Sequence, residues 1–329
     1  MQLSAFTIVD GDPDEGSGER DRLRDAVELG VAADAAGLTA IWVAEHHFDS
    51  VGQCPAPSVL LAAIGARTRT IRLGVMVSVL PFHDPVDLAE QYALLDRLSA
   101  GRLNLGVGSG YLASEFEGFG IDPATKRDRF DAAYDRLIAA MGGETVTLSA
   151  MSTPVRINVR PVQTPHPPIW IAVQRREAVP FVGRRGANLA LIPYATLASV
   201  EELREIISEY RASLPSGTTG RVSIGLHLYA GDRPEVARAS LQRFLDSRLR
   251  THSTHYEAKV KADPGQATSE AIERSGFALL GAPADVAERL SEFRRAGVDE
   301  VMGIFDFGGL PIELATASVR AMGREWNAR

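Results

Sequence analysis

Short apolar runs alternate with longer amphipathic stretches along almost the whole chain of 329 residues. Each apolar run has the length of a buried β-strand, and each amphipathic stretch has the spacing of a helix. Strands and helices that alternate in this way favour parallel strands joined by right-handed crossovers. Eight strands, each followed by a helix, predict an α/β fold, the (β/α)8 TIM barrel with insertions. The strands are expected at residues 3–9, 40–44, 71–80, 103–107, 169–173, 188–192, 221–229 and 300–305.

Two segments interrupt this alternation. Residues 144–168 combine short alternating runs with several prolines, which favours a hairpin insertion over a linker between domains. We therefore expect one domain over residues 1–329. The second segment, residues 231–281, separates the seventh strand from its helix by about fifty residues, far more than an ordinary βα loop.

The second insertion has two parts of different character. Residues 235–249 have a helix-like pattern, and residues 250–275 are polar. Long loops on the catalytic face of a barrel are often lids. We expect a mobile lid here, with His252, His255 and Lys259 facing solvent.

Charge and cysteine content narrow the class of protein. A net charge of −7 argues against nucleic acid or an anionic membrane as the main partner. The chain has no apolar run long enough to span a bilayer and no secretory signal at its N-terminus. The lone Cys54 fits a reducing compartment. These features predict a cytoplasmic protein that handles small molecules.

Three ionisable residues, Glu45, His46 and His47, directly follow the strand at 40–44. The C-terminal ends of barrel strands are where catalytic residues are placed. Neighbouring side chains on a strand point to opposite faces, so we expect one histidine to be functional and the other structural. No metal site is expected, because the spacing differs from H-E-x-x-H and further ligands would have to come from elsewhere in the chain.

Two loops offer contacts for an anion. The glycine-rich run from Gly106 to Tyr111 would let backbone amides approach a phosphate, although a tight turn explains the same glycines. The loop after the fifth strand reads Gln174-Arg175-Arg176. Both arginines are also compatible with a solvated helix start.

Several segments together resemble the bacterial-luciferase-like flavin monooxygenases, in the family's order and over nearly the whole chain. They are AIWVAEHHF, then IRLGVMVSVLPFHDPVDLAEQYALLDRLSAGRLNLGVGSGYLASEFEGFGID, PVQTPHPPIWIAV, VGRRG and GAPADVAERLSEFRRAGVDEV. The resemblance implies a barrel that binds reduced FMN at its C-terminal mouth and forms a flavin 4a-hydroperoxide with O₂. It also implies oxidation of a small organic substrate, electrons from a separate NAD(P)H–flavin reductase, and a homodimer.

The resemblance also assigns roles to individual residues. The family's catalytic histidine matches His46, and Glu45 precedes it in the motif that would face the cofactor. A histidine suits this role because it exchanges protons near neutral pH. Residues matching Met76 and Val77 lie under the flavin ring in this family, often joined by a non-prolyl cis peptide. Cys54 does not match the reactive cysteine of some luciferases, whose position is Gly108 here.

The phosphate site departs from the family's pattern. An arginine often stands where this chain has Ser109, followed here by Gly110 and Tyr111. Our hypothesis is that Arg175 or Arg176, beside Gln174, supplies the missing positive charge, with Ser109 as a neutral donor. An arginine–phosphate pair can be bidentate and strong.

Two other functions stay open at this stage. The same barrel serves a deazaflavin coenzyme, in which case the protein would transfer hydride without O₂. It could also bind flavin without turnover. Trp42, Trp170 and His227 lie on expected strands, where we favour core positions, and His227 facing the pocket is the alternative.

Overall fold

The computed structural model describes residues 1–11, 21–48, 50, 52–147, 154–250 and 254–329. Eight parallel strands close into a barrel in the order β9, β11, β1, β2, β3, β4, β7, β8, and β8 pairs back onto β9. This confirms the predicted (β/α)8 barrel. The barrel strands are β1 (Gln2–Thr7), β2 (Ala40–Val43), β3 (Arg72–Val79), β4 (Leu103–Gly108), β7 (Ile169–Ala172), β8 (Asn188–Leu191), β9 (Val222–Ala230) and β11 (Glu300–Ile304).

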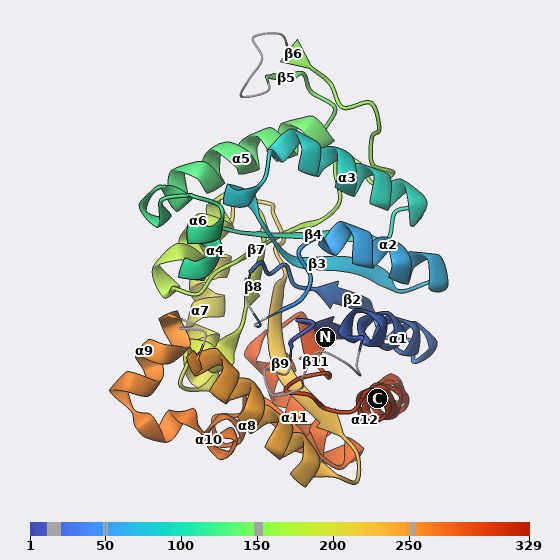
Figure 1. Ribbon diagram of the computed structural model, residues 1–329, viewed down its shortest axis with the longest axis vertical. Helices are drawn as coiled ribbons and strands as arrows, with labels where there is room; N and C mark the ends of the chain where they lie inside the picture. The colour runs from blue at the N-terminus through green and yellow to red at the C-terminus, as the bar shows by residue number, and fades with distance from the viewer. Residues whose placement is uncertain (12–20, 49, 51, 148–153, 251–253) are drawn as a thin grey trace.

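A helix follows each barrel strand and covers the outside of the barrel (Figure 1). Prolines and capping side chains fix several helix starts. Asp84, for example, accepts hydrogen bonds from the backbone amides of Val86 and Asp87, and Pro85 occupies the first helical position. The helices are α1 (Arg22–Ala35), α2 (Pro57–Arg67), α3 (Pro85–Leu98), α5 (Lys126–Met141), α6 (Val179–Arg184), α7 (Val200–Ala212), α11 (Pro283–Ala296) and α12 (Ile312–Asn327).

Two buried tryptophans fill the interior of the barrel. The rings of Trp42 and Trp170 meet edge to face with their centroids 5.0 Å apart. The Trp42 indole donates a hydrogen bond of 2.9 Å to Glu300 Oε1, and Gly74 leaves room for its ring. A Cβ atom at Gly74 would lie 2.2 Å from the Trp42 ring. The predicted core role of both tryptophans is confirmed.

The first insertion forms the predicted hairpin. Strands β5 (Val146–Thr147) and β6 (Pro154–Val155) pair antiparallel and project from the rest of the molecule (Figure 1). Residues 148–153, which join them, lie outside the described residues.

The second insertion is mostly helical. It holds α8 (Pro234–Arg250), α9 (Thr254–Ala262), α10 (Ser269–Arg274) and an additional strand, β10 (Ala278–Gly281), which pairs parallel with the second half of β9. The sequence predicted the first of these helices but neither α9, α10 nor β10. Within the ranges described above, no helix is both long and apolar enough to cross a lipid bilayer.

The prediction that Lys259 faces solvent is wrong. Its ammonium is half-buried and donates hydrogen bonds of 2.9 and 2.8 Å to the carbonyls of Tyr194 and Leu197. The reason is that α9 packs its buried Tyr256 against the loop that follows β8, which carries the lysine inward. His252 lies outside the described residues, as does the side chain of His255.

Candidate active site

A cavity of about 390 Å³ opens at the C-terminal ends of the barrel strands. This volume is in the range of ligand pockets. The residues predicted to form the site come from four separate loops and strand ends, and nine of the ten line this one cavity: Glu45, His46, Met76, Val77, Ser109, Gly110, Tyr111, Gln174 and Arg175.

His46 is held in place from the loop after β2. Its Nδ1 lies 3.0 Å from Oε1 of Glu115, a fully buried carboxyl on the short helix α4 (Ala113–Gly118). The same oxygen accepts a hydrogen bond from the backbone amide of His47. A carboxylate at this distance accepts the Nδ1 proton, which leaves Nε2 as the ring nitrogen available to a ligand. The ring of Tyr111 meets the His46 ring edge to face.

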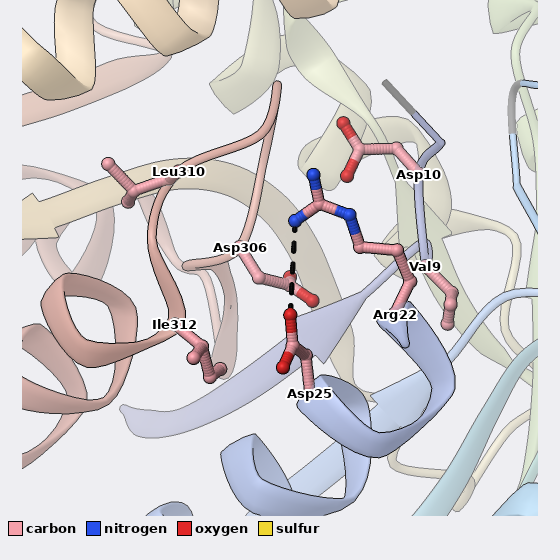
Figure 2. A pocket seen from close by; sticks show the side chains of 7 residues that line it. All are labelled: Val9, Asp10, Arg22, Asp25, Asp306, Leu310 and Ile312. Carbon is pink, nitrogen blue, oxygen red and sulfur yellow. Dashed lines mark ion pairs between the residues drawn. The ribbon is translucent and has the colours of Figure 1, made fainter. Parts of the chain in front are cut away.

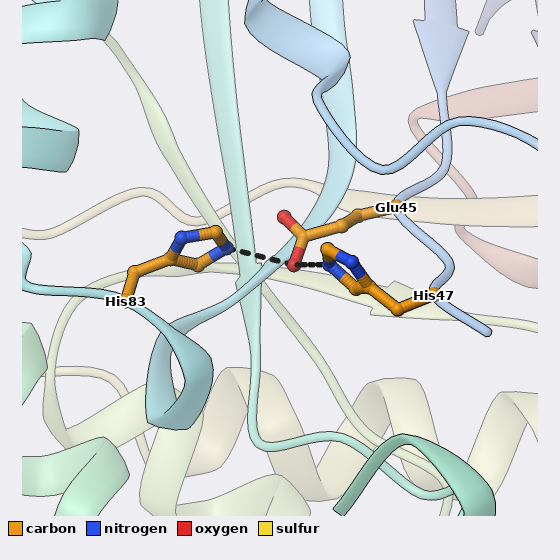
Figure 3. A group of neighbouring side chains, drawn as sticks. All are labelled: Glu45, His47 and His83. Carbon is orange, nitrogen blue, oxygen red and sulfur yellow. Dashed lines mark hydrogen bonds and ion pairs between the residues drawn. The ribbon is translucent and has the colours of Figure 1, made fainter. Parts of the chain in front are cut away.

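Glu45 forms a second cluster beside His46. Its Oε1 lies 3.1 Å from Nε2 of His47 and 2.8 Å from Nε2 of His83, which comes from the start of the loop before α3 (Figure 3). Burial favours a higher pKa for the Glu45 carboxyl, but the two histidines outweigh burial and lower it. Burial likewise favours a lower pKa for His83, yet the bond to Glu45 raises it above its ordinary value. His47 therefore pairs with Glu45 in this cluster, whereas His46 is the histidine of the pair that lines the cavity.

These three side chains also bring potential metal ligands together. Their ligand atoms all lie within 4.8 Å of one another, so His83 is a partner from elsewhere in the chain that the sequence did not reveal. Two ligands on one tetrahedral zinc ion, at bonds of about 2.0–2.1 Å, lie roughly 3.3 Å apart. The 2.8 Å between Glu45 and His83 is shorter and is an ordinary charge-assisted hydrogen bond.

Met76 and Val77 lie on β3 where its pairing with β4 shifts register, and the peptide bond between them is cis, as the family resemblance implied. Two glycines of β4 make room for this part of β3. A Cβ atom at Gly106 would lie 2.3 Å from the carbonyl oxygen of Val75, and one at Gly108 would lie 2.7 Å from the Val77 side chain. Packing against β3 therefore explains these two glycines without a ligand.

One side of the cavity is strongly basic. Lys126 and Arg127, at the start of α5, line the cavity together with Arg175. The Lys126 ammonium lies 3.4 Å from the carbonyl oxygen of Gly110, and burial, with the charge of Arg175, lowers its pKa. The start of a helix also presents unpaired amides, so this region suits an anion.

Arg176 does not reach the cavity. Its exposed guanidinium pairs with Glu209 and Glu205 of α7. Of the two arginines predicted for the phosphate, the structure brings only Arg175 to the site. The side chain of Arg176 points instead to the helix that neighbours α6.

Sequence reasoning missed several cavity residues. Lys126 and Arg127 carried one usable signal, because two cations in a first helical turn oppose the helix dipole. Arg248 of α8 and Tyr194 had no such signal. His227 lies on β9, is completely buried and does not line the cavity, so the favoured core position is confirmed.

A separate, very small hollow lies between the loop after β1 and the loop after β11 (Figure 2). Asp10 accepts a hydrogen bond of 2.6 Å from the amide of Gly308, and Arg22 lies 3.9 Å from Asp25. Burial raises the pKa of Asp306 well above its ordinary value, which favours the protonated acid. The cluster joins the ends of the first and last barrel strands.

Sequence comparison agrees with this geometry. The chain matches the luciferase-like monooxygenase family over residues 1–300. It is 31% identical to the protein y4wF of Sinorhizobium fredii, covering 94% of this chain and 92% of that one. It is 25% identical to the oxygenase component of the flavin-dependent trigonelline monooxygenase of Acinetobacter baylyi, covering 99% and 94%.

Solved structures show the same fold. Monooxygenase RslO1 of Streptomyces bottropensis superposes with a TM-score of 0.83 at 23% identity, covering 100% and 99% of the two chains. The oxygenating constituent of 3,6-diketocamphane monooxygenase of Pseudomonas putida, in complex with FMN, gives 0.81 at 17% identity, covering 99% and 97%. An F420-dependent secondary alcohol dehydrogenase gives 0.74 at 15% identity, covering 98% of each chain. Family match, barrel and cavity agree: the chain belongs to the luciferase-like monooxygenases, a family of flavin-dependent oxidoreductases.

Proposed function

We propose that this protein is the oxygenase of a two-component system, which uses reduced FMN and O₂ to insert one oxygen atom into a small organic substrate. A separate NAD(P)H–flavin reductase supplies the reduced FMN, as expected of relatives described as an oxygenase component. The observation that carries the proposal is the pair His46–Glu115, which lines the same cavity as the Met76–Val77 segment and the basic side at Lys126.

The residues present fit FMN at both of its ends. The phosphate, a dianion, would be held by Arg175, Lys126 and Arg127, with Ser109 as a neutral donor. Met76 and Val77 offer an apolar surface for the flat ring. This proposal revises the sequence hypothesis, because the charge lost at Ser109 comes from three cations that include Arg175 and exclude Arg176.

Bound reduced FMN would supply the electrons and the activation of O₂. The chain's own residues would do the rest. His46, held through Nδ1 by Glu115, would present Nε2 to hold or move one proton near the reacting atoms. Apolar walls that include Phe6 and Ile171 would exclude water from the site. This matters because, where water enters, the reduced oxygen is lost as H₂O₂ before it reaches the substrate.

The decisive experiment compares cofactors. The purified protein is titrated with FMN and, separately, with a deazaflavin coenzyme, and binding is followed by the change in fluorescence. We expect FMN to bind at least about 10-fold more tightly, because its terminal phosphate is a dianion that several cations can pair with, whereas the phosphate of the deazaflavin coenzyme is a diester with a single negative charge. Binding of the deazaflavin alone would assign the protein to hydride transfer instead.

A second measurement tests turnover. With reduced FMN, O₂ and a panel of small organic compounds, oxidised product should form, and His46→Asn should release most of the reduced oxygen as H₂O₂. Tight FMN binding without any product or O₂ consumption would mean that the protein binds flavin without catalysis.

A homodimer is part of the proposal. Most apolar side chains of α2 and α3 pack on the barrel, but Val59, Leu94 and Leu98 are 69%, 50% and 70% exposed on these neighbouring helices. Exposed apolar patches of this kind favour an interface. Sedimentation should show a dimer that Leu94→Glu weakens, and an unchanged dimer would place the interface elsewhere.

A further inference from the structure

We propose that Arg248 binds an anionic group of the substrate, so that the protein acts on small organic acids with an apolar body. The proposal rests on the proposed function in one respect, since it takes FMN to occupy the basic side of the cavity at Lys126 and Arg175.

Arg248 enters the cavity from a different side than those cations. It lies near the end of α8, which follows β9. Around the barrel, β9 is three strand positions from β4, which precedes Lys126, and two from β7, which precedes Arg175. Its side chain is only 3% exposed, yet it lines the cavity. The cavity lining therefore carries a cation on the β9 side of the barrel in addition to Lys126, Arg127 and Arg175.

The surroundings of Arg248 strengthen its attraction for an oxyanion. The guanidinium lies over the ring of Phe244, 4.6 Å from its centroid, and hydrogen-bonds with the hydroxyl of Tyr194, which also lines the cavity. Aromatic walls keep water from competing for the charge. The planar fork of a guanidinium matches a carboxylate with two parallel hydrogen bonds.

His227 is a second, independent sign of polar function in this region. Its ring is completely buried, and its centroid lies 5.0 Å from that of the Tyr194 ring and 4.7 Å from that of the Phe244 ring. Neither ring nitrogen has a hydrogen-bond partner among the described residues. Burial, with the charge of Arg248, lowers the pKa of His227 to about 3, so the ring is neutral. A neutral imidazole retains one N–H, so an unsatisfied polar group lies beside the ring of Tyr194, which lines the cavity.

Much of the remaining cavity wall is apolar. It includes Phe6, Ile8, Ile171 and Leu191. A ligand with its charge at Arg248 would therefore lay an apolar or aromatic body across this wall, toward His46. This places the reacting carbon of an organic acid away from its carboxylate.

The experiment uses matched acids and neutral analogues as probes. Octanoate with octanamide, and benzoate with benzamide, are titrated calorimetrically into the full-length protein saturated with FMN. Each acid should bind about 10- to 100-fold more tightly than its amide, the range for charge-assisted pairing. Equal binding of acid and amide would overturn the proposal.

Variants locate the preference. Arg248→Met should reduce acid binding to the level of the amide, whereas Arg250→Met, at the exposed end of the same helix, should keep the preference. A preference that survives in Arg248→Met would also overturn the proposal. Arg248→Lys keeps the charge without the fork and should give intermediate binding, so it serves if the methionine variant does not fold.

FMN affinity separates the two proposals. If Arg248→Met binds FMN more than about 10-fold more weakly, Arg248 is a cofactor anchor and the substrate role is wrong. If the native protein does not bind FMN at all, the proposed function fails, and the acid preference measured without FMN still decides the role of Arg248.

Discussion

His46 and Glu115 are 69 residues apart in the chain, and their side chains meet at 3.0 Å beside the cavity. The carboxyl comes from α4, a helix of six residues that lies over the barrel mouth. Because Glu115 also accepts the backbone amide of His47, one carboxyl fixes both the histidine loop and the His46 ring. Glu115 is thus a positioning residue for His46.

Replacing Glu115 with Gln should lower kcat by about 10- to 100-fold, while FMN affinity changes less than about two-fold. The expected loss is smaller than that for removing an acid–base group outright, because His46 itself stays in place. The amide keeps the size of the side chain but no longer accepts the Nδ1 proton as a charged group. Stopped-flow turnover and FMN titration would measure the two effects. Glu117→Gln, exposed on the same helix, is the control and should leave both unchanged. Equal losses in the two variants would contradict this role.

Replacing Arg175 with Ala should weaken FMN binding by about 10- to 100-fold, because a charge-assisted contact to phosphate is lost. Arg176→Ala is a matched control from the adjacent position, since its guanidinium pairs with Glu205 and Glu209, and FMN affinity should be unchanged. Fluorescence titration at fixed ionic strength measures both. If Arg176→Ala weakened FMN binding and Arg175→Ala did not, Arg176 would be the residue that holds the phosphate.

The contribution of His83 to stability should depend on pH. Its pKa is raised above its ordinary value of 6.5, so the stabilisation is fully present below pH 6.5 and is lost as the pH rises through the folded pKa. His83→Gln should therefore cost about 1 kcal/mol at pH 6 and less at pH 9. Urea denaturation at both pH values measures the difference. His166→Gln is the control, because the Nδ1 of His166 lies 2.8 Å from the carbonyl oxygen of the adjacent Pro167 and not beside a carboxyl among the described residues. A cost for His83→Gln that is equal at both pH values would refute the prediction.

Adding one methyl group at Gly74 should destabilise the barrel. The new Cβ would lie 2.2 Å from the Trp42 ring, which cannot retreat because Trp170 and Glu300 hold it. We expect Gly74→Ala to lower the free energy of unfolding by about 3 kcal/mol, the upper end for overpacking. Gly142→Ala, at a helical C-cap with φ of −67°, should change it by less than about 0.5 kcal/mol. Urea denaturation measures both variants. An unfolding midpoint of Gly74→Ala equal to that of the native protein would show that the barrel interior can rearrange around the added methyl group.

The sequence was sufficient for the barrel because each strand is a continuous apolar run and each helix has its own start and stop. It also led to His46, Met76 and Ser109, which lie inside segments with a family resemblance and line one cavity, while their roles stay predictions. Contacts made across the fold left no such trace. Nothing in the run of residues around His83 indicates that its ring meets Glu45, 38 residues earlier.

Composition was misleading where a polar segment packs only a few side chains. The residues after 250 are rich in Lys, Thr and Ser, which indicates a solvated loop, but the buried ring of Tyr256 and the hydrogen bonds of Lys259 dock α9. Likewise β10 is only four residues long and is specified by its neighbour β9 rather than by its own pattern.

The pairing of β10 with β9 has a consequence for how this protein could be changed. The chain leaves the barrel at Ala230 and returns at Gly281, and these two residues are register partners, with the Gly231 amide donating to the Gly281 carbonyl at 2.9 Å. A segment whose ends meet can be exchanged as a cassette with little demand on the scaffold. Grafting the corresponding stretch of a relative onto this barrel, between residues 231 and 281, would therefore replace the wall that carries Arg248 while leaving His46 and the basic side of the cavity in place.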